Sequence, residues 1–233
     1  MKLSIVIPAF NEEKTISEIL KRVNAISISG VEKQVVVVND GSTDATALAI
    51  SNLQFLPPKR DPASGGTISK FKLLNHIKNQ GKGAAVRTGI KNATGDYIVI
   101  QDADLEYNPK DIEKLIVPVL DGASKVVYGT RLKRLPSFSK EERTPQFLLH
   151  YVGNKFLSLL TSIRYGQWIT DMETGDRLVA RSVVKDMKLN SKRFNFEPEI
   201  TAKLLNAKIK IIEIPISYTK RGFSEGKKIK WLN

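Results

Sequence analysis

The stretch of sequence that decides the fold is YIVIQDADLE, residues 97–106. Its first four residues predict a short buried strand, and acidic side chains follow almost directly. Asp102 and Asp104 are two residues apart, so their carboxylates point the same way from an extended segment. Such a pair can bind one divalent cation, and the alternative is a solvated acidic turn. Its position at the end of a buried strand favours the cation site.

Further strands and helices are predicted on both sides of this stretch. Apolar runs predict the strands, and apolar residues at helical spacing predict most of the helices. We expect strands at residues 3–8, 34–38, 71–74, 97–100 and 125–129, and a strand pair at 208–218. We expect helices at residues 12–28, 44–53, 81–93, 146–163 and 197–205. The alternation predicts an α/β fold with a mainly parallel central sheet and helices on both faces.

Polar clusters fall where three of the predicted strands end, at residues 10–12, 39–42 and 102–106. Ligands of such sheets bind beyond the carboxyl ends of the strands, so we expect these clusters to converge on one edge. Asp40 is a candidate acceptor of hydrogen bonds from a nucleobase or ribose. A helix-capping turn, with Ser42 or Thr43 as the cap of helix 44–53, explains the same residues and is compatible with binding.

The segment Gly81-Lys82-Gly83 opens the helix predicted at 81–93. Helix N-termini favour anions, and glycine allows a close approach of the backbone to a ligand. The segment is not a Walker motif, because the Lys-Ser/Thr ending is missing. A tight turn with a surface lysine is the alternative interpretation.

Composition limits the classes of partner. The 233 residues have a formal net charge of +13, no cysteine and two histidines. A metal site must therefore rely on carboxylates, which favours Mg²⁺ or Mn²⁺ over zinc. The charge attracts polyanions such as nucleic acid, anionic lipid headgroups and phosphorylated substrates. No aromatic-rich base-stacking motif lies among the basic stretches, which disfavours a nucleic-acid-binding domain.

No apolar run reaches the roughly 18–20 residues that a membrane span needs, so we expect no transmembrane domain. The missing signal peptide and the absence of cysteine fit a cytoplasmic protein. The unusually apolar helix 146–163 has two interpretations, an interfacial helix near lipid and a core helix, and Gly153-Asn154-Lys155 argues against a span. Trp168 also has two interpretations, contact with the acceptor and a place in the core, and the core is favoured.

Five motifs occur in order along nearly the whole chain: IVIPAFNEE (5–13), VNDGSTD (38–44), GKG (81–83), DAD (102–104) and GTR (129–131). Together they resemble the family 2 glycosyltransferases, which have the Rossmann-like GT-A fold. The resemblance implies one catalytic domain over residues 1–233. Its nucleotide-sugar-binding half spans 1–130, and its acceptor-binding half, with a basic tail, spans 131–233.

The resemblance also implies roles for individual residues. The nucleotide-sugar-binding residues that it implies are Pro8, Phe10, Glu12, Asp40, Lys82, Asp102, Ala103 and Asp104. The implied ligands of Mg²⁺ or Mn²⁺ at the donor diphosphate are Asp102, Asp104 and, as a further ligand, Glu106.

Three later segments narrow the resemblance: TDMETG (170–175), FEPE (196–199) and RGFSEGKKIKW (221–231). They are similar to the dolichyl-phosphate and polyprenyl-phosphate sugar synthases, which move mannose, glucose or a modified sugar from a nucleoside diphosphate to a lipid phosphate. Uridine and guanosine donors both fit the motifs. Arginine and lysine are suited to a phosphate acceptor. The candidates for that contact are Arg131, Arg221, Lys227 and Lys228.

The catalytic candidates are Asp104, Arg131, Arg221 and Asp171. The resemblance implies inversion in a single displacement. An ionised lipid phosphate needs no strong base, so catalysis would rest on positioning and charge stabilisation. Asp171 would then orient basic residues or close the site. A sugar hydroxyl acceptor would need a carboxylate base, for which Asp171 and Glu173 are the candidates. We expect attachment at the cytoplasmic face of a membrane, and peripheral binding, a membrane partner subunit and a soluble acceptor stay open.

Overall fold

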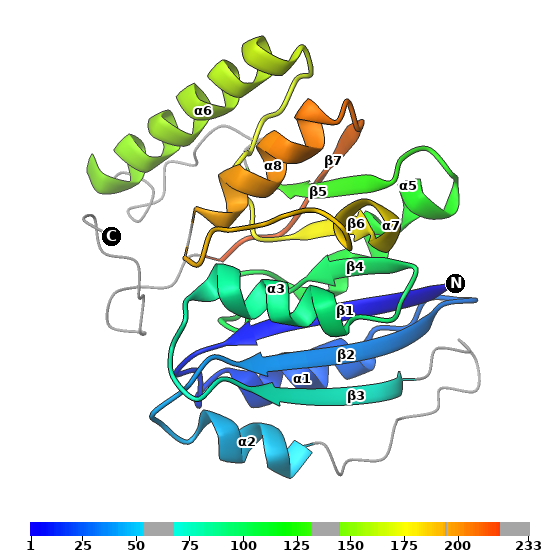
Figure 1. Ribbon diagram of the computed structural model, residues 1–233, viewed down its shortest axis with the longest axis vertical. Coiled ribbons are helices and arrows are strands. Elements are labelled where there is room, and N and C mark those ends of the chain that lie inside the picture. The colour runs from blue at the N-terminus through cyan, green and yellow to red at the C-terminus, as the bar shows by residue number, and fades with distance from the viewer. Residues whose placement is uncertain (54–67, 132–144, 194, 220–233) are drawn as a thin grey trace.

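The computed structural model describes residues 1–53, 68–131, 145–193 and 195–219, and one seven-stranded sheet runs through its centre (Figure 1). The strands are β1 (Lys2–Ala9), β2 (Glu32–Asn39), β3 (Ile68–Asn75), β4 (Tyr97–Ile100), β5 (Val126–Thr130), β6 (Arg177–Ala180) and β7 (Ile211–Pro215). The α-helices are α1 (Ile16–Ala25), α2 (Thr46–Leu53), α3 (Lys82–Asn92), α4 (Ile112–Leu115), α5 (Val117–Leu120), α6 (Pro145–Tyr165), α7 (Arg181–Val184) and α8 (Phe196–Asn206). A short 3₁₀ helix, η1 (Pro109–Asp111), precedes α4.

The strand order is β3-β2-β1-β4-β6-β5-β7. Every pairing is parallel except those of β6, which runs antiparallel to both β4 and β5. The expected mainly parallel sheet is therefore confirmed. Because β6 runs the other way, its first residue lies at the edge where the other strands end. The predicted site residues that the structure describes lie on the turns at that edge or in the segments next to it.

The core forms two layers, one on each face of the sheet. Alternate residues of β1 point to opposite faces, as a strand requires. Ile5 belongs to the same core layer as α1 residues such as Ile19, whereas Val6 belongs to the layer that contains Val86 of α3 and Ile200 of α8. Figure 1 shows α3 and α8 in front of the sheet and α1 behind it. This confirms the expected helices on both faces.

Several predicted boundaries change. Helix α1 is shorter than the expected 12–28, because the turn before it is held by side-chain contacts at the sheet edge. The helix cap predicted at Ser42 or Thr43 is wrong, since Asp44 accepts the hydrogen bond from the backbone N–H of Thr46. Strand β6 was not predicted. In the strand pair expected at residues 208–218, the first strand is β7, and in place of the second there is one isolated β-bridge, between Tyr218 and Tyr107.

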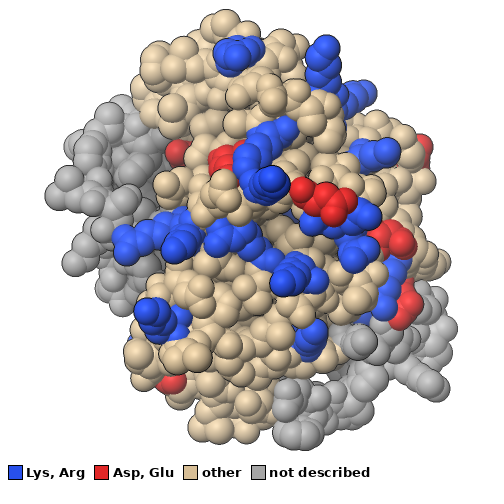
Figure 2. Space-filling model, in the orientation of Figure 1, with Lys and Arg blue, Asp and Glu red and all other residues tan. Residues whose placement is uncertain are grey.

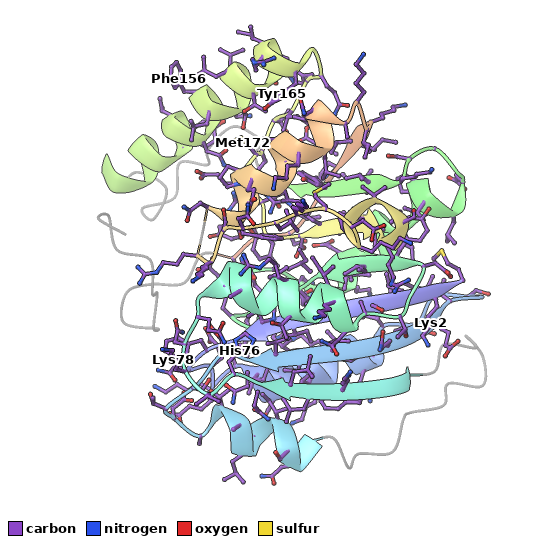
Figure 3. The ribbon with its side chains drawn as sticks, in the orientation of Figure 1. Lys2, His76, Lys78, Phe156, Tyr165 and Met172 are labelled. Carbon is purple, nitrogen blue, oxygen red and sulfur yellow. The ribbon has the colours of Figure 1, made fainter. Side chains whose placement is uncertain are left out.

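Helix α6 has its polar side towards the protein and much of its apolar side towards solvent. Asn154, Ser158 and Ser162 repeat every four residues and are buried. The exposed apolar side chains of α6 are Val152, Phe156, Leu157, Leu159, Leu160 and Ile163, and they are 40% to 72% exposed. Figure 3 shows Phe156 on the side away from α8, and Tyr165 on the side towards it. The core-helix interpretation therefore fails for this side of α6.

Trp168, which follows α6, is 70% exposed, so its predicted place in the core is wrong. The physical reason is that polar contacts hold this segment against the protein. Ser162 accepts a hydrogen bond from the backbone N–H of Ile169, and Gln167 donates one to the carbonyl of Ile211. Among the described residues, no helix is long and apolar enough to cross a membrane.

Candidate active site

The turns that follow β1, β2, β3, β4 and β5 meet at one edge of the sheet, together with the segment that leads into β6. Figure 3 shows His76 and Lys78 on the turn between β3 and α3. The predicted convergence of the residues around Asp40 and Asp102 follows from this topology.

The acidic turn after β4 is shaped by local hydrogen bonds. Leu105 has a positive φ of 63°, which turns the chain sharply between Asp104 and Glu106. The carboxylate of Asp104 accepts a hydrogen bond from the backbone N–H of Glu106 (3.1 Å). The carboxylate of Glu106 in turn accepts one from the hydroxyl of Tyr218 (2.7 Å). Asp104 and Ala103 therefore sit on a fixed turn at the end of β4.

Lys82 lies against this acidic turn. Its ammonium nitrogen is 2.8 Å from Oδ1 and 2.9 Å from Oδ2 of Asp102, and 3.0 Å from Oε1 of Glu197. Burial alone would lower the pKa of Lys82, but Asp102 and Glu197 outweigh it and raise that pKa far above its ordinary value. The ammonium therefore stays charged at neutral pH. The surface-lysine interpretation is wrong, because the side chain is only 19% exposed.

The glycines at the start of α3 allow a close approach, and the chain itself makes that approach. A Cβ atom on Gly81 would lie 2.4 Å from the carbonyl oxygen of Lys192, and one on Gly83 would lie 2.5 Å from that of Ser191. The backbone N–H of Ala84 donates to the same Lys192 carbonyl (3.1 Å). Residues 191–193 therefore lie against the first turn of α3, and the binding of an anion there stays a prediction.

Asp40 holds the turn that leads into α3. Its carboxylate accepts hydrogen bonds from the backbone N–H groups of Gln80 (3.0 Å) and Gly81 (2.8 Å), and lies 2.6 Å from Nδ1 of His76. Nε2 of His76 reaches the hydroxyl of Thr88 on α3 (2.9 Å). Asp40 is buried, so the structure shows it as an organiser of this turn. Direct contact with a donor stays a prediction.

Pro8 lies near the end of β1 and Phe10 directly follows the strand; both are half-buried, and the buried Glu12 comes two residues later. The backbone N–H of Glu12 donates to the hydroxyl of Thr46 at the start of α2 (2.8 Å). The Glu12 carboxylate accepts a hydrogen bond from the Thr15 hydroxyl (2.7 Å). Pro8, Phe10 and Glu12 thus lie on the same edge as Asp40, and their contact with a nucleotide stays a prediction.

Arg131, directly after β5, forms an ion pair with the buried Asp171. Nε and Nη2 of the guanidinium each donate to one carboxylate oxygen (2.8 Å each), and the backbone N–H of Arg131 donates as well (3.0 Å). Asn154 of α6 donates to the same carboxylate (2.8 Å). Burial would raise the pKa of Asp171, but the bonds from Arg131 hold it below its usual value. An ionised acid fixed on a guanidinium fits the orienting role predicted for Asp171 better than that of a base.

The ring of Tyr107 links the Arg131 side of the edge to the acidic turn. The Arg131 guanidinium carbon is 5.9 Å from the centre of the Tyr107 ring and 5.2 Å from that of Tyr218. A Cβ atom on Gly175 would lie 2.6 Å from Oδ2 of Asp102 and 2.9 Å from the Tyr107 ring. The Tyr107 hydroxyl accepts a hydrogen bond from the backbone N–H of Gly175 (3.0 Å). Arg131 and Asp102 therefore both lie near the Tyr107 ring.

The sequence did not point to Asp176 and Arg177, which lie beneath the site. Both are 1% exposed. Burial, and then the charges of Asp102 and Asp111, raise the pKa of Asp176 well above its usual value. Arg177 donates to the Met172 carbonyl (2.8 Å) and lies 4.9 Å from the centre of the Tyr128 ring. A single sequence gives no signal for burial that depends on such distant partners.

Glu197 was also not predicted as a site residue, although the motif FEPE contains it. That motif was the available signal. Arg221, Lys227 and Lys228 lie outside the described residues, so the structure gives no place for them.

The fit of a divalent cation can be judged from these contacts. In the part of the chain that the structure describes, no three Asp, Glu or His side chains gather into a group that could hold a metal. Mg²⁺ commonly binds through one or two carboxylates and substrate phosphates, without an all-protein cage. Asp102 and Asp104 fit that second arrangement, with Lys82 already on Asp102. The three-ligand set with Glu106 stays a prediction.

A family model described as Glycosyl transferase family 2 matches residues 4–187. The chain belongs to glycosyltransferase family 2. This family 2 enzyme is 29% identical to a UDP-N-acetylglucosamine–dolichyl-phosphate N-acetylglucosaminyltransferase of Methanococcus voltae, over 95% of the chain and 88% of that protein. It is 28% identical to the dolichol-phosphate mannosyltransferase of Pyrococcus furiosus, over 97% of the chain and 59% of that protein.

The fold of the family 2 enzyme is shared with solved structures. Glucosyl-3-phosphoglycerate synthase from Mycobacterium tuberculosis, in complex with Mn²⁺, UDP and glucosyl-3-phosphoglycerate, matches with a TM-score of 0.67 and 18% identity. The match covers 96% of this chain and 74% of that one. The likeness confirms the expected GT-A fold.

Proposed function

We propose that this family 2 glycosyltransferase moves a sugar from a nucleoside-diphosphate sugar, of the GDP-mannose or UDP-glucose type, to a polyprenyl or dolichyl phosphate, with inversion at the sugar. The observation that carries the proposal is the fixed guanidinium of Arg131, which lies near the same Tyr107 ring as Asp102 of the acidic turn. An acidic turn suits the metal-bound diphosphate that leaves, and an arginine suits an acceptor that is itself a phosphate. Relatives named for dolichyl-phosphate transfer support the same acceptor.

The donor side is proposed at the ends of β1, β2 and β4. The proposed donor-binding residues are Pro8, Phe10, Glu12, Asp40, Lys82, Asp102, Ala103 and Asp104. Asp104 and Asp102 would hold Mg²⁺ or Mn²⁺ together with the diphosphate, and Glu106 is a further candidate ligand. The metal would supply positive charge to the departing nucleoside diphosphate. The solved relative with bound Mn²⁺ and UDP supports this choice of cofactor.

On the acceptor side, Arg131 is the proposed phosphate contact, with Arg221, Lys227 and Lys228 of the tail as further candidates. A guanidinium has five N–H donors, more than the two that Asp171 takes. Asp171 fixes the direction of Arg131 and stays ionised. The phosphate oxygen is the nucleophile and already carries charge, so no side chain has to remove a proton. Rate enhancement then comes from orientation and charge stabilisation.

Attachment to the cytoplasmic face of a membrane is part of the proposal, through the outer apolar side of α6. That side includes Phe156 and Ile163, and residues 145–165 contain two basic residues and no acid. Apolar and basic side chains together favour the interface of an anionic bilayer. Figure 2 shows further Lys and Arg side chains across the middle of the face that carries α3 and α8.

A vesicle experiment tests this attachment. The double variant Phe156→Ser/Ile163→Ser should lose sedimentation with vesicles of mixed neutral and anionic lipid. The matched control is Leu48→Ser, which removes a 63% exposed apolar side chain from α2 and should sediment like the wild type. Equal sedimentation of all three proteins would contradict the lipid role of α6. A membrane partner subunit would then be the alternative means of attachment.

The proposed reaction is tested by two measurements on the full chain. The melting temperature is measured with UDP or GDP, with and without Mn²⁺. It should rise, in a metal-dependent way, with the nucleotide whose nucleobase is that of the donor. Sugar transfer should then proceed to a short polyprenyl phosphate. The alternative reaction is transfer to a glycan or small hydroxyl acceptor. A pH–rate profile that requires Asp171 or Glu173 as a titrating base would favour that alternative.

A further inference from the structure

The ammonium of Lys82 is shared between two acids from distant parts of the chain. Asp102 belongs to the turn after β4, and Glu197 to the first turn of α8. The two carboxylates are 14% and 8% exposed, and Lys82 is within 3.0 Å of both. One cation thus compensates two acids that are largely removed from solvent.

The charges of this trio have a consequence for binding. Two carboxylates and one ammonium leave one net negative charge. A buried charge that loses its partner is strongly disfavoured. Because Lys82 contacts both acids, it keeps an ionic partner when either acid moves away. Asp102 can therefore leave Lys82 for another cation while Glu197 remains in place.

Glu197 and its neighbour Glu199 differ in what they hold. The Glu199 carboxylate accepts hydrogen bonds from the backbone N–H groups of Asn190 and Ser191 and pairs with Lys203. For Glu197, Oε1 faces Lys82, and Oε2 is buried without a hydrogen-bond partner among the described residues. Glu199 thus holds the segment that covers the start of α3, whereas Glu197 pairs with Lys82.

We propose that Glu197 is a positioning residue that holds Lys82 when Asp102 turns to the donor. The inference rests on the proposed function, in which Asp102 serves the donor diphosphate or its metal. Donor binding draws Asp102 towards the new cation, and Glu197 keeps the Lys82 ammonium compensated and in place. If Glu197 loses its charge, Asp102 is the one acid of this pair that still compensates the Lys82 ammonium. Donor binding then has to break the contact between Lys82 and Asp102.

The test is the affinity of the full chain for UDP and GDP in MnCl₂, measured by titration calorimetry. Glu197→Gln keeps the shape of the side chain and removes its charge. We expect it to weaken nucleotide binding about tenfold, the size of a typical coupling between contacting groups. Glu197→Asp, which restores a carboxylate on a shorter side chain, should bind with intermediate affinity.

A second condition separates the proposed role from a merely structural one. In the proposed role a cation at the donor attracts Asp102, so the difference in nucleotide affinity between wild type and Glu197→Gln should be smaller in EDTA than in MnCl₂. Glu199→Gln is the matched control on the same helix. It should lower the melting temperature and leave nucleotide affinity unchanged.

Each outcome decides a different point. If the wild type binds UDP or GDP and Glu197→Gln binds equally well, the inference is overturned and the proposed function stands. Equal weakening in Glu197→Gln and Glu199→Gln, or the same difference between wild type and Glu197→Gln with and without Mn²⁺, would also overturn the inference. If the wild type binds neither nucleotide, the proposed function fails and the inference fails with it.

Discussion

Replacing Asp171 with asparagine tests how Arg131 is held. The substitution keeps the size of the side chain but removes the negative charge that pairs with the guanidinium of Arg131, whose side chain is 19% exposed. Breaking one side of a buried ion pair costs about 3–5 kcal/mol of unfolding free energy. The partial exposure of Arg131 places the expected loss near the lower end, at about 3 kcal/mol. For a chain of this length, that loss lowers the melting temperature by roughly 6–12 °C.

Urea unfolding of wild type and Asp171→Asn, followed by circular dichroism, measures this loss. The comparison also has a predicted pH dependence. Folding lowers the pKa of Asp171, so its stabilising contribution is fully present above the unfolded pKa of about 3.9. That contribution is lost as pH falls through the folded pKa. The difference between the two proteins should thus be constant from about pH 5 to 8 and shrink in acid.

A double variant provides the control for Asp171→Asn. Arg131→Met/Asp171→Leu removes both charges and should be more stable than Asp171→Asn, because no buried charge is left unpaired. A loss below about 1 kcal/mol in Asp171→Asn would be the size of an exposed ion pair. That result, or a difference that does not change in acid, would show that the charge of Asp171 does not hold Arg131.

Two further substitutions test other parts of the structure. Gly175→Ala places a Cβ atom 2.6 Å from Oδ2 of Asp102, and should lower stability by about 1–3 kcal/mol and weaken Mn²⁺-dependent nucleotide binding. Gly153→Ala, in open space on α6, should raise stability by roughly 0.5–1 kcal/mol, and the opposite order of melting temperatures would contradict both. Burial lowers the pKa of Lys33 to about 8, so the unfolded chain binds more protons between about pH 8 and 10.4. Over that range the stability of the wild type should rise relative to Lys33→Met in urea unfolding, and a constant difference would argue against a buried ammonium.

The parts of the fold that the sequence predicts well are those fixed by local pattern. The four-residue run before Asp102 predicts β4 with the observed bounds, because its apolar side chains are buried on both faces. Strand β6 has no such pattern. It begins at Arg177, whose burial depends on the Met172 carbonyl and the Tyr128 ring, and these partners are known only after folding.

The same distinction holds for the site. Asp40 and Asp102 follow predicted parallel strands, so their shared edge could be predicted from topology. The partners of Lys82 could not, because Glu197 reaches it from the other half of the chain. Trp168 shows the opposite error. Its aromatic ring suggested the core, whereas the hydrogen bonds of the surrounding segment leave it exposed.

The proposed acceptor of this family 2 enzyme is a lipid phosphate. The most direct measurement is mass spectrometry of lipid extracted after incubation with Mn²⁺, a short polyprenyl phosphate, and UDP-glucose, GDP-mannose or UDP-N-acetylglucosamine. We expect a lipid that is heavier by one sugar joined through its phosphate, and no product from the matching polyprenol. Absence of sugar-bearing lipid with all three donors, or equal glycosylation of the polyprenol, would rule out the proposed acceptor.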